Sequence, residues 1–120
     1  MNDETTPSCI LVVEDEMVLA MLIEDILGDA GYKVLMASRV PLALKIVESD
    51  TRVNAALLDI NVAGKQVFPV AERLRDQGIP FAFASGYGDM GLPEAFRACP
   101  VLQKPYLPDA LTSAVTKLLT

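Results

Sequence analysis

The 120-residue sequence contains no histidine and no tryptophan, and it has only two cysteines. Without histidine, the chain has no imidazole to act as a general base, a metal ligand or a phosphate carrier, so carboxylates must carry the chemistry. Cys9 and Cys99 are too far apart in the sequence for a disulfide framework or for a metal-binding spacing. We therefore expect both to be reduced, buried thiols.

Long hydrophobic runs are also missing. The longest ones cover residues 10–13 and 17–23, far short of the roughly 18 residues that would indicate a membrane span. Residues 1–7 are acidic and lack the basic start and apolar centre of a secretory signal. We expect a short disordered lead over residues 1–7, a cytoplasmic location and no membrane contact.

The charge balance is acidic, with a formal net charge of -6. Such a chain is repelled by nucleic acid and by anionic membranes, so its partners are expected to be proteins. Hydrophobic residues make up 52% of the sequence, which favours a folded chain over a disordered one. The length suits one domain with one core, which we place over residues 8–120.

Five short apolar runs alternate with segments of helical period, at residues 9–13, 33–37, 55–58, 80–84 and 101–102. The runs are continuously apolar, which is typical of parallel strands covered on both faces by helices. The pattern predicts an α/β, flavodoxin-like fold: a doubly wound, five-stranded parallel sheet with five helices. Counting strands along the chain, the expected order is 2-1-3-4-5.

The helices differ in how clearly the sequence marks them. In the first, six apolar positions share one face, and Gly31 is suited to end it: Leu19, Leu22, Ile23, Ile26, Leu27 and Ala30. The second is expected over residues 40–48, the third from near Phe68 to Gly78, and the fifth from about Pro108. A short fourth helix is expected over residues 93–98, and residues 60–67 are expected to form a loop.

Polar residues gather where four of the predicted strands end: Glu14, Asp15 and Glu16; Asp59 and Asn61; Ser85 and Gly86; Lys104 and Pro105. The carboxyl ends of parallel strands meet at one edge of the sheet, and ligands bind there. If strands one and three are neighbours, Glu14, Asp15 and Asp59 share one pocket. Each motif alone is common in turns and helix caps, but their joint placement at four strand ends favours a functional site.

Three carboxylates in one pocket repel each other and stay ionised only beside a cation. An all-oxygen, partly hydrated site suits Mg²⁺ or Mn²⁺. Such a site also favours phosphoryl binding, with Lys104 neutralising one oxygen while the Ser85 hydroxyl and the Gly86 N–H bind the others. Asp59, at the end of the central strand, is then the expected nucleophile.

These residues resemble the receiver domains of response regulators in two-component phosphorelays, along nearly the whole chain. The resemblance implies that Asp59 is the phospho-acceptor and that Mg²⁺ is bound by Asp15, Asp59 and the Asn61 carbonyl, with Glu14 in the outer part of the acidic pair. It implies that Ser85 and Lys104 sense the phosphoryl group and that the bond before Pro105 is cis. The implied donor is a histidine kinase or a histidine phosphotransfer protein, and the chain catalyses only its own phosphorylation and dephosphorylation.

Residues 80–87, with the sequence Pro-Phe-Ala-Phe-Ala-Ser-Gly-Tyr, resemble the single-domain subfamily with the Phe-Ala-Thr-Gly (FAT GUY) signature, as do residues 58–61 and 103–105. Ser85 replaces the threonine but keeps its hydroxyl. Val101 stands where most receivers have an aromatic switch residue, so that rotamer switch cannot operate. Our hypothesis is that Tyr87 and the glycine-rich residues 86–91 rearrange with Ser85 instead.

Three alternatives remain. A phosphohydrolase with an aspartate nucleophile would have a second acid at the position of Asn61. A flavodoxin-like nucleotide or flavin binder would have a phosphate-cradling loop where residues 14–16 are acidic. A pseudo-receiver would lack part of the set Asp15, Asp59 and Lys104. Separately, three further apolar residues of the first helix suggest either core packing or a kinase or homodimer contact: Met17, Val18 and Met21.

Overall fold

The computed structural model describes residues 7–86, 92–104 and 106–120. Five strands form a parallel sheet in the order β2-β1-β3-β6-β7. Their bounds are β1 (Cys9–Val13), β2 (Lys33–Ala37), β3 (Ala55–Asp59), β6 (Phe81–Ser85) and β7 (Val101–Gln103). This is the predicted strand order, because β4 and β5 belong to a separate two-stranded sheet.

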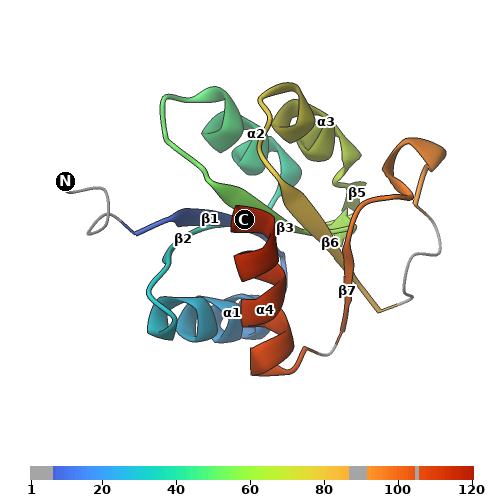
Figure 1. Cartoon of the computed structure of the whole chain (residues 1–120). Coiled ribbons are helices and arrows are strands. Elements are labelled where there is room, and N and C mark those ends of the chain that lie inside the picture. Colours follow the sequence, from blue (N-terminus) through green and yellow to red (C-terminus); the bar gives the residue numbers. More distant parts are fainter. Residues whose placement is uncertain (1–6, 87–91, 105) are drawn as a thin grey trace.

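In the described ranges, four α-helices cover the two faces of the sheet: α1 (Met17–Asp29), α2 (Val40–Glu48), α3 (Phe68–Asp76) and α4 (Pro108–Leu119). Figure 1 shows α2 and α3 on one face and α1 and α4 on the other. The predicted doubly wound α/β fold is therefore confirmed. Within the described ranges, no helix has both the length and the apolar character that crossing a membrane requires.

The central strands are buried on both faces because their side chains alternate between two hydrophobic clusters. In β1, Leu11 and Val13 join the cluster that also contains residues of α2 and α3. Ile10 and Val12 join the opposite cluster, with residues of α1 and α4. All five residues of β1 are buried, which explains why the sequence of this strand is continuously apolar instead of alternating.

Two helices end at a glycine with positive φ, as the sequence predicts. Gly31 has a φ of 96° and Gly78 a φ of 72°, a region that side chains rarely adopt. After α1, the N–H of Gly31 donates to the Gly28 carbonyl and that of Tyr32 to the Leu27 carbonyl. This pair of bonds is the Schellman motif, and the same pair follows α3.

The prediction of five helices is wrong by one in the described part of the chain. Residues 93–98, expected to form a short helix, contain only a single 3-10 turn, η2 (Glu94–Phe96). Pro93 has no N–H to donate, and Pro100 restricts the residue before it to extended backbone. The few residues between the two prolines are too short for a stable α-helix.

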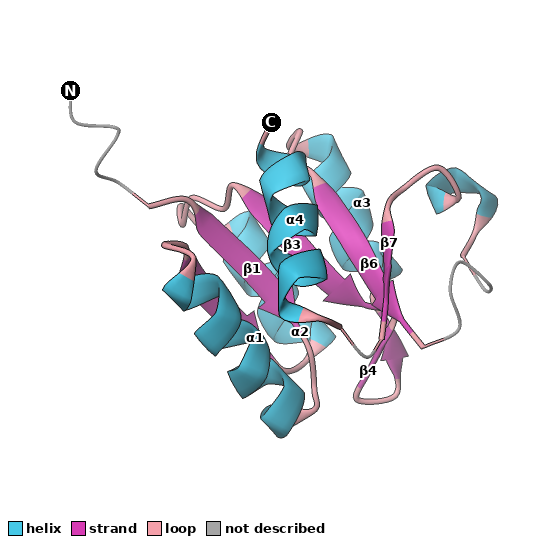
Figure 2. Cartoon of the chain, turned by 60° about the horizontal axis from the view of Figure 1, so that its bottom comes forward, coloured by secondary structure: helices cyan, strands magenta, loops and turns pink. Residues whose placement is uncertain are grey.

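The expected loop over residues 60–67 is a β-hairpin. The strands β4 (Asn61–Val62) and β5 (Lys65–Gln66) pair antiparallel, with Val62 opposite Lys65. Ala63 and Gly64 form the two-residue turn and have φ values of 52° and 83°, as in the turn type that best matches strand twist. Figure 2 shows the hairpin just beyond the carboxyl ends of the strands.

The buried face of α1 is narrower than the sequence predicts. Ile23 and Leu27 are fully buried, and Leu19 and Ile26 pack against the same cluster at its margin. Leu22 and Ala30, expected in the core, are exposed. The two cysteines are free thiols as expected, but only Cys9 is buried, because Cys99 is partly exposed.

Two leucines of α1 make a matched test of this packing. Leu27→Ala should lower the free energy of unfolding by about 2–5 kcal/mol, because it leaves a cavity at a residue with no exposed surface. Leu22→Ala removes the same atoms from a side chain that is 47% exposed, so the loss should stay below about 1 kcal/mol. Urea unfolding of both variants measures the difference, and equal losses would contradict the assigned burial.

Candidate functional site

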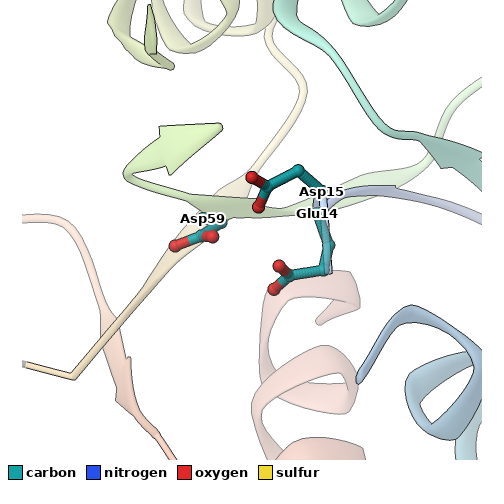
Figure 3. A group of neighbouring side chains, drawn as sticks. All are labelled: Glu14, Asp15 and Asp59. Carbon is teal, nitrogen blue, oxygen red and sulfur yellow. The ribbon is translucent and has the colours of Figure 1, made fainter. Parts of the chain in front are cut away.

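Three carboxylates come together where β1 and β3 end side by side. Val13 pairs with Leu58 across the two strands, so the residues that follow, Glu14 just after β1 and Asp59 at the end of β3, lie next to each other. Figure 3 shows their side chains and that of Asp15 turned toward a common space. One carboxylate oxygen from each lies within 4.8 Å of the others. The carboxylate cluster predicted from the strand ends is therefore present.

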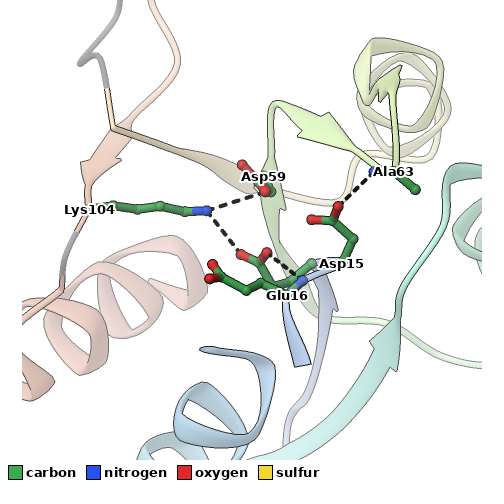
Figure 4. Close-up of polar contacts among 6 residues, drawn as sticks. Asp15, Glu16, Asp59, Ala63 and Lys104 are labelled. Carbon is green, nitrogen blue, oxygen red and sulfur yellow. Dashed lines mark hydrogen bonds and ion pairs between the residues drawn. The ribbon is translucent and has the colours of Figure 1, made fainter. Parts of the chain in front are cut away.

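Lys104 supplies the positive charge of this cluster. Its ammonium nitrogen lies 3.1 Å from Glu14 Oε1 and 3.2 Å from Asp59 Oδ2, as the dashed lines in Figure 4 show. Its backbone N–H donates to the Ser85 carbonyl at 3.0 Å, which continues the pairing of β6 with β7 by one residue. The lysine is thus held at both ends, by the sheet through its backbone and by two carboxylates through its side chain.

Burial makes the charges of Glu14 and Asp59 costly. Glu14 is only 3% exposed, and its second oxygen accepts the Glu16 N–H at 3.0 Å. Desolvation raises the pKa of Glu14 above its usual value, although that N–H and Lys104 oppose the rise. Desolvation likewise raises the pKa of Asp59, with Lys104 opposing it and the charge of Asp15 adding to it. Both groups favour nearby positive charge.

The same surroundings favour the charged form of the lysine. Burial by itself lowers the pKa of Lys104, but the hydrogen bond to Glu14 and the charges of Asp59 and Glu14 outweigh it. The net effect raises the pKa above the usual lysine value. The ammonium therefore stays protonated while it contacts both carboxylates.

Asp15 differs from the other two carboxylates because it is exposed to solvent. Its Oδ2 accepts the backbone N–H of Ala63, in the β4–β5 turn, at 2.9 Å. In Figure 4 its other oxygen is directed toward Asp59. Sequence reasoning missed this contact, since an alanine in a turn carries no polar side chain that would mark it.

The remaining predicted site residues lie at the same edge of the sheet. Ser85 ends β6 and is buried, and the exposed Gly86 follows it. Asn61 begins β4 with an exposed side chain and pairs with Gln66, so the backbone just after Asp59 is part of the hairpin. The proposed switch residue Tyr87, the glycines Gly88 and Gly91, and Pro105 with its expected cis bond lie outside the described residues.

Tyr106, two residues after Lys104, is a further neighbour of the site. It packs, partly buried, against the cluster that includes residues of α1 and α4. Burial raises the pKa of its phenol, and the charges of Glu14 and Asp59 raise it further. The phenol therefore lies within electrostatic reach of both carboxylates and stays neutral beside them.

The cluster fits a small divalent cation. With all groups ionised, three carboxylates and one ammonium leave two negative charges, which a divalent ion balances. The donors are hard oxygens, and exposed Asp15 lets water complete the coordination shell, as Mg²⁺ prefers. Lys104 already contacts Glu14 and Asp59, so Asp15 is the carboxylate of the three without a cationic partner among the described residues.

Two of the three comparisons with known proteins find matches. No family model matches the sequence. The respiration control protein ArcA of Escherichia coli K12 is 31% identical over 115 residues, which cover 92% of this chain and 48% of ArcA. The chain thus spans about half the length of the curated relatives it matches.

Solved structures give fuller matches. SdrG from Sphingomonas melonis Fr1 is 40% identical, with a TM-score of 0.82 over 95% of this chain and 98% of that one. A second SdrG structure, in a BeF3-activated conformation, matches over the full length of both chains with a TM-score of 0.79. A response regulator receiver protein from Sinorhizobium medicae WSM419 is 26% identical over 94% of each chain, with a TM-score of 0.79.

These matches cover nearly the whole chain, and the strand order and the carboxylate–lysine cluster are those expected from the sequence. The chain belongs to the response regulator receiver family.

Proposed function

We propose that this receiver takes a phosphoryl group on Asp59 from a histidine kinase or a histidine phosphotransfer protein and signals by protein contact. The observation that carries the proposal is the position of Asp59, which ends the central strand 3.2 Å from the Lys104 ammonium and beside two further carboxylates. The fold and its relatives support the same role. We also propose that the chain acts in the cytoplasm, belongs to the Phe-Ala-Thr-Gly-signature subfamily and turns over no other substrate.

In the transfer, a carboxylate oxygen of Asp59 forms a bond to phosphorus as the bond to the donor's imidazole nitrogen breaks. The imidazole keeps the electron pair and takes up a proton, and the product is an acyl phosphate. Lys104 stabilises charge on a phosphoryl oxygen, and the Ser85 hydroxyl donates to another. Asp15, Asp59 and the Asn61 carbonyl would hold Mg²⁺, which would neutralise the carboxylates and bind phosphoryl oxygens.

A small phosphodonor tests the proposal without an identified kinase. Incubation with acetyl phosphate should add the mass of one phosphoryl group to the intact protein, and the gain should require Mg²⁺. Asp59→Ala should remove it, because the nucleophile is lost. Asp76→Ala is a suitable control, since that carboxylate ends α3 and is not part of the cluster.

The other outcomes identify the alternative functions. Steady release of phosphate from esters, with no lasting mass gain, would favour a phosphohydrolase. No gain with Mg²⁺ at any donor concentration would favour a pseudo-receiver that acts by binding alone.

Stability measurements test whether the ionised Asp59 carboxylate lowers the free energy of unfolding and whether Mg²⁺ restores it. Without metal, Asp59→Asn should raise the unfolding temperature, because it removes a partly buried charge from a cluster with excess negative charge. Saturating Mg²⁺ should stabilise the native chain by about 2.7 kcal/mol at a hundred times its Kd and stabilise the variant less. Thermal unfolding in EDTA and in Mg²⁺ measures both effects. A variant that is less stable than the native chain in EDTA would contradict this account.

The face of α1 next to the site fits the docking of the phosphodonor protein. Met17, Val18 and Met21 are 73%, 78% and 58% exposed, and α1 begins two residues after Asp15. An apolar patch of this kind on a small acidic protein favours contact with another protein. The exposure of these three side chains argues against core packing, and we propose that they contact the phosphodonor protein.

A charge in this patch should separate protein donors from small ones. Met21→Glu should slow phosphoryl transfer from a phosphorylated histidine phosphotransfer protein at least tenfold, because it places a charge in the apolar contact. Labelling by acetyl phosphate should be unchanged. Leu42→Glu is the matched control, as Leu42 is 44% exposed on α2, across the sheet from α1. Equal slowing by both variants would exclude α1 as the docking face.

A further inference from the structure

The β4–β5 turn has a backbone that its sequence does not favour. Ala63 has a φ of 52°, and it is the one non-glycine residue with positive φ in the described part of the chain. Most side chains avoid this region, and a glycine would hold it at lower cost. A residue kept in such a conformation is held there by its surroundings.

The contact that accompanies this conformation is the hydrogen bond to Asp15. The left-handed backbone at Ala63 lies at the tip of the hairpin, and the Ala63 N–H donates to Asp15 Oδ2 at 2.9 Å. The bond joins residues 48 apart in the sequence, from the loop after β1 to the turn after β3. A bond to a charged acceptor is stronger than one between neutral groups.

We infer that the Ala63 N–H is a positioning group that fixes the rotation of the Asp15 carboxylate and so presets one ligand of the divalent cation. The inference rests on the proposed function, because it assumes that the cluster binds Mg²⁺. Asp15 has no cationic partner among the described residues, whereas Lys104 fixes Glu14 and Asp59. The hairpin does for the exposed carboxylate what the lysine does for the other two.

The physical basis is the freedom that Asp15 would otherwise have. An exposed carboxylate samples several rotamers, and binding an ion through it requires that this freedom be lost. With Oδ2 held by the turn, the other oxygen already faces Asp59, as Figure 4 shows. Partners that orient metal ligands typically change metal affinity by 10–100-fold when they are removed.

The hydrogen bond itself can be tested without metal. In the amide NMR spectrum, the Ala63 proton should lie downfield because its acceptor is charged, and Asp15→Ala should move it upfield. Amide protons of α3 should not move. An Ala63 signal that is indifferent to Asp15→Ala would overturn the inference, whatever the result with Mg²⁺.

Two glycine variants then test the effect on metal binding. Gly64→Val strains the turn at a φ of 83°, where an added Cβ would meet no atom within 4 Å. It should weaken Mg²⁺ binding about tenfold in an NMR titration. Gly78→Val makes the same change after α3, at a φ of 72° and also in open space, and should leave Mg²⁺ affinity unchanged. Both variants should lose similar thermal stability.

A third variant separates the effect of the Ala63 N–H from that of the Ala63 side chain. Ala63→Gly keeps the donor and relieves the strained φ, so Mg²⁺ affinity should stay at the native value or improve. The inference fails if Gly64→Val keeps native affinity or if Gly78→Val loses as much. If the native chain binds no Mg²⁺, or binds it equally after Asp59→Ala, the proposed function fails instead.

Discussion

The Lys104 ammonium, placed between Glu14 and Asp59, is the contact on which the arrangement of the site depends. Without it, the buried carboxylate of Glu14 and the partly buried carboxylate of Asp59 would face each other with no positive charge between them. Removing the lysine would leave both carboxylates without that positive charge, which is strongly destabilising. The same residue donates its backbone N–H to the end of β6, so one lysine links the ends of strands β1, β3, β6 and β7. The sheet therefore fixes the position of Asp59 relative to Lys104.

Charge is the property that distinguishes the carboxyl edge of the sheet, where three carboxylates gather. Desolvation raises the pKa of Glu14 and of Asp59, so the folded chain holds these carboxylates at a cost in stability when they are ionised. In the proposed function, a bound cation would lower that cost, and phosphoryl transfer would convert the Asp59 carboxylate to an acyl phosphate. The proposed phosphoryl acceptance and the stability of the folded chain would therefore depend on the same carboxylates.

The sequence predicts most of this site because the topology does the positioning. Once Asp59 and Lys104 lie at the ends of parallel strands, the strand order alone brings them together. The Asp15–Ala63 contact could not be predicted, since it depends on a backbone N–H and a positive φ that alanine does not signal. The small width of the buried face of α1 could not be predicted either. Leu22 fits the helical period of the apolar residues, yet its side chain is exposed in the fold.

Aromatic rings pack together around β6, although the residue at position 101 of the neighbouring strand β7 is a valine. Phe83 on β6 pairs with Val101 in register and lies 5.6 Å, between ring centroids, from Phe96 on η2. Phe96 in turn stacks on Phe68 and lies under the Arg75 guanidinium, whose Nη1 also donates to the Ala95 carbonyl at 3.0 Å. These contacts fix η2 to α3 and β6 in place of the longer helix that the sequence predicts there. Val101 has no ring that could rotate as a switch. The aromatic side chains that pack beside it are Phe83, Phe96 and Phe68, on β6, η2 and α3, and the contacts of Arg75 and Phe96 hold these three elements together.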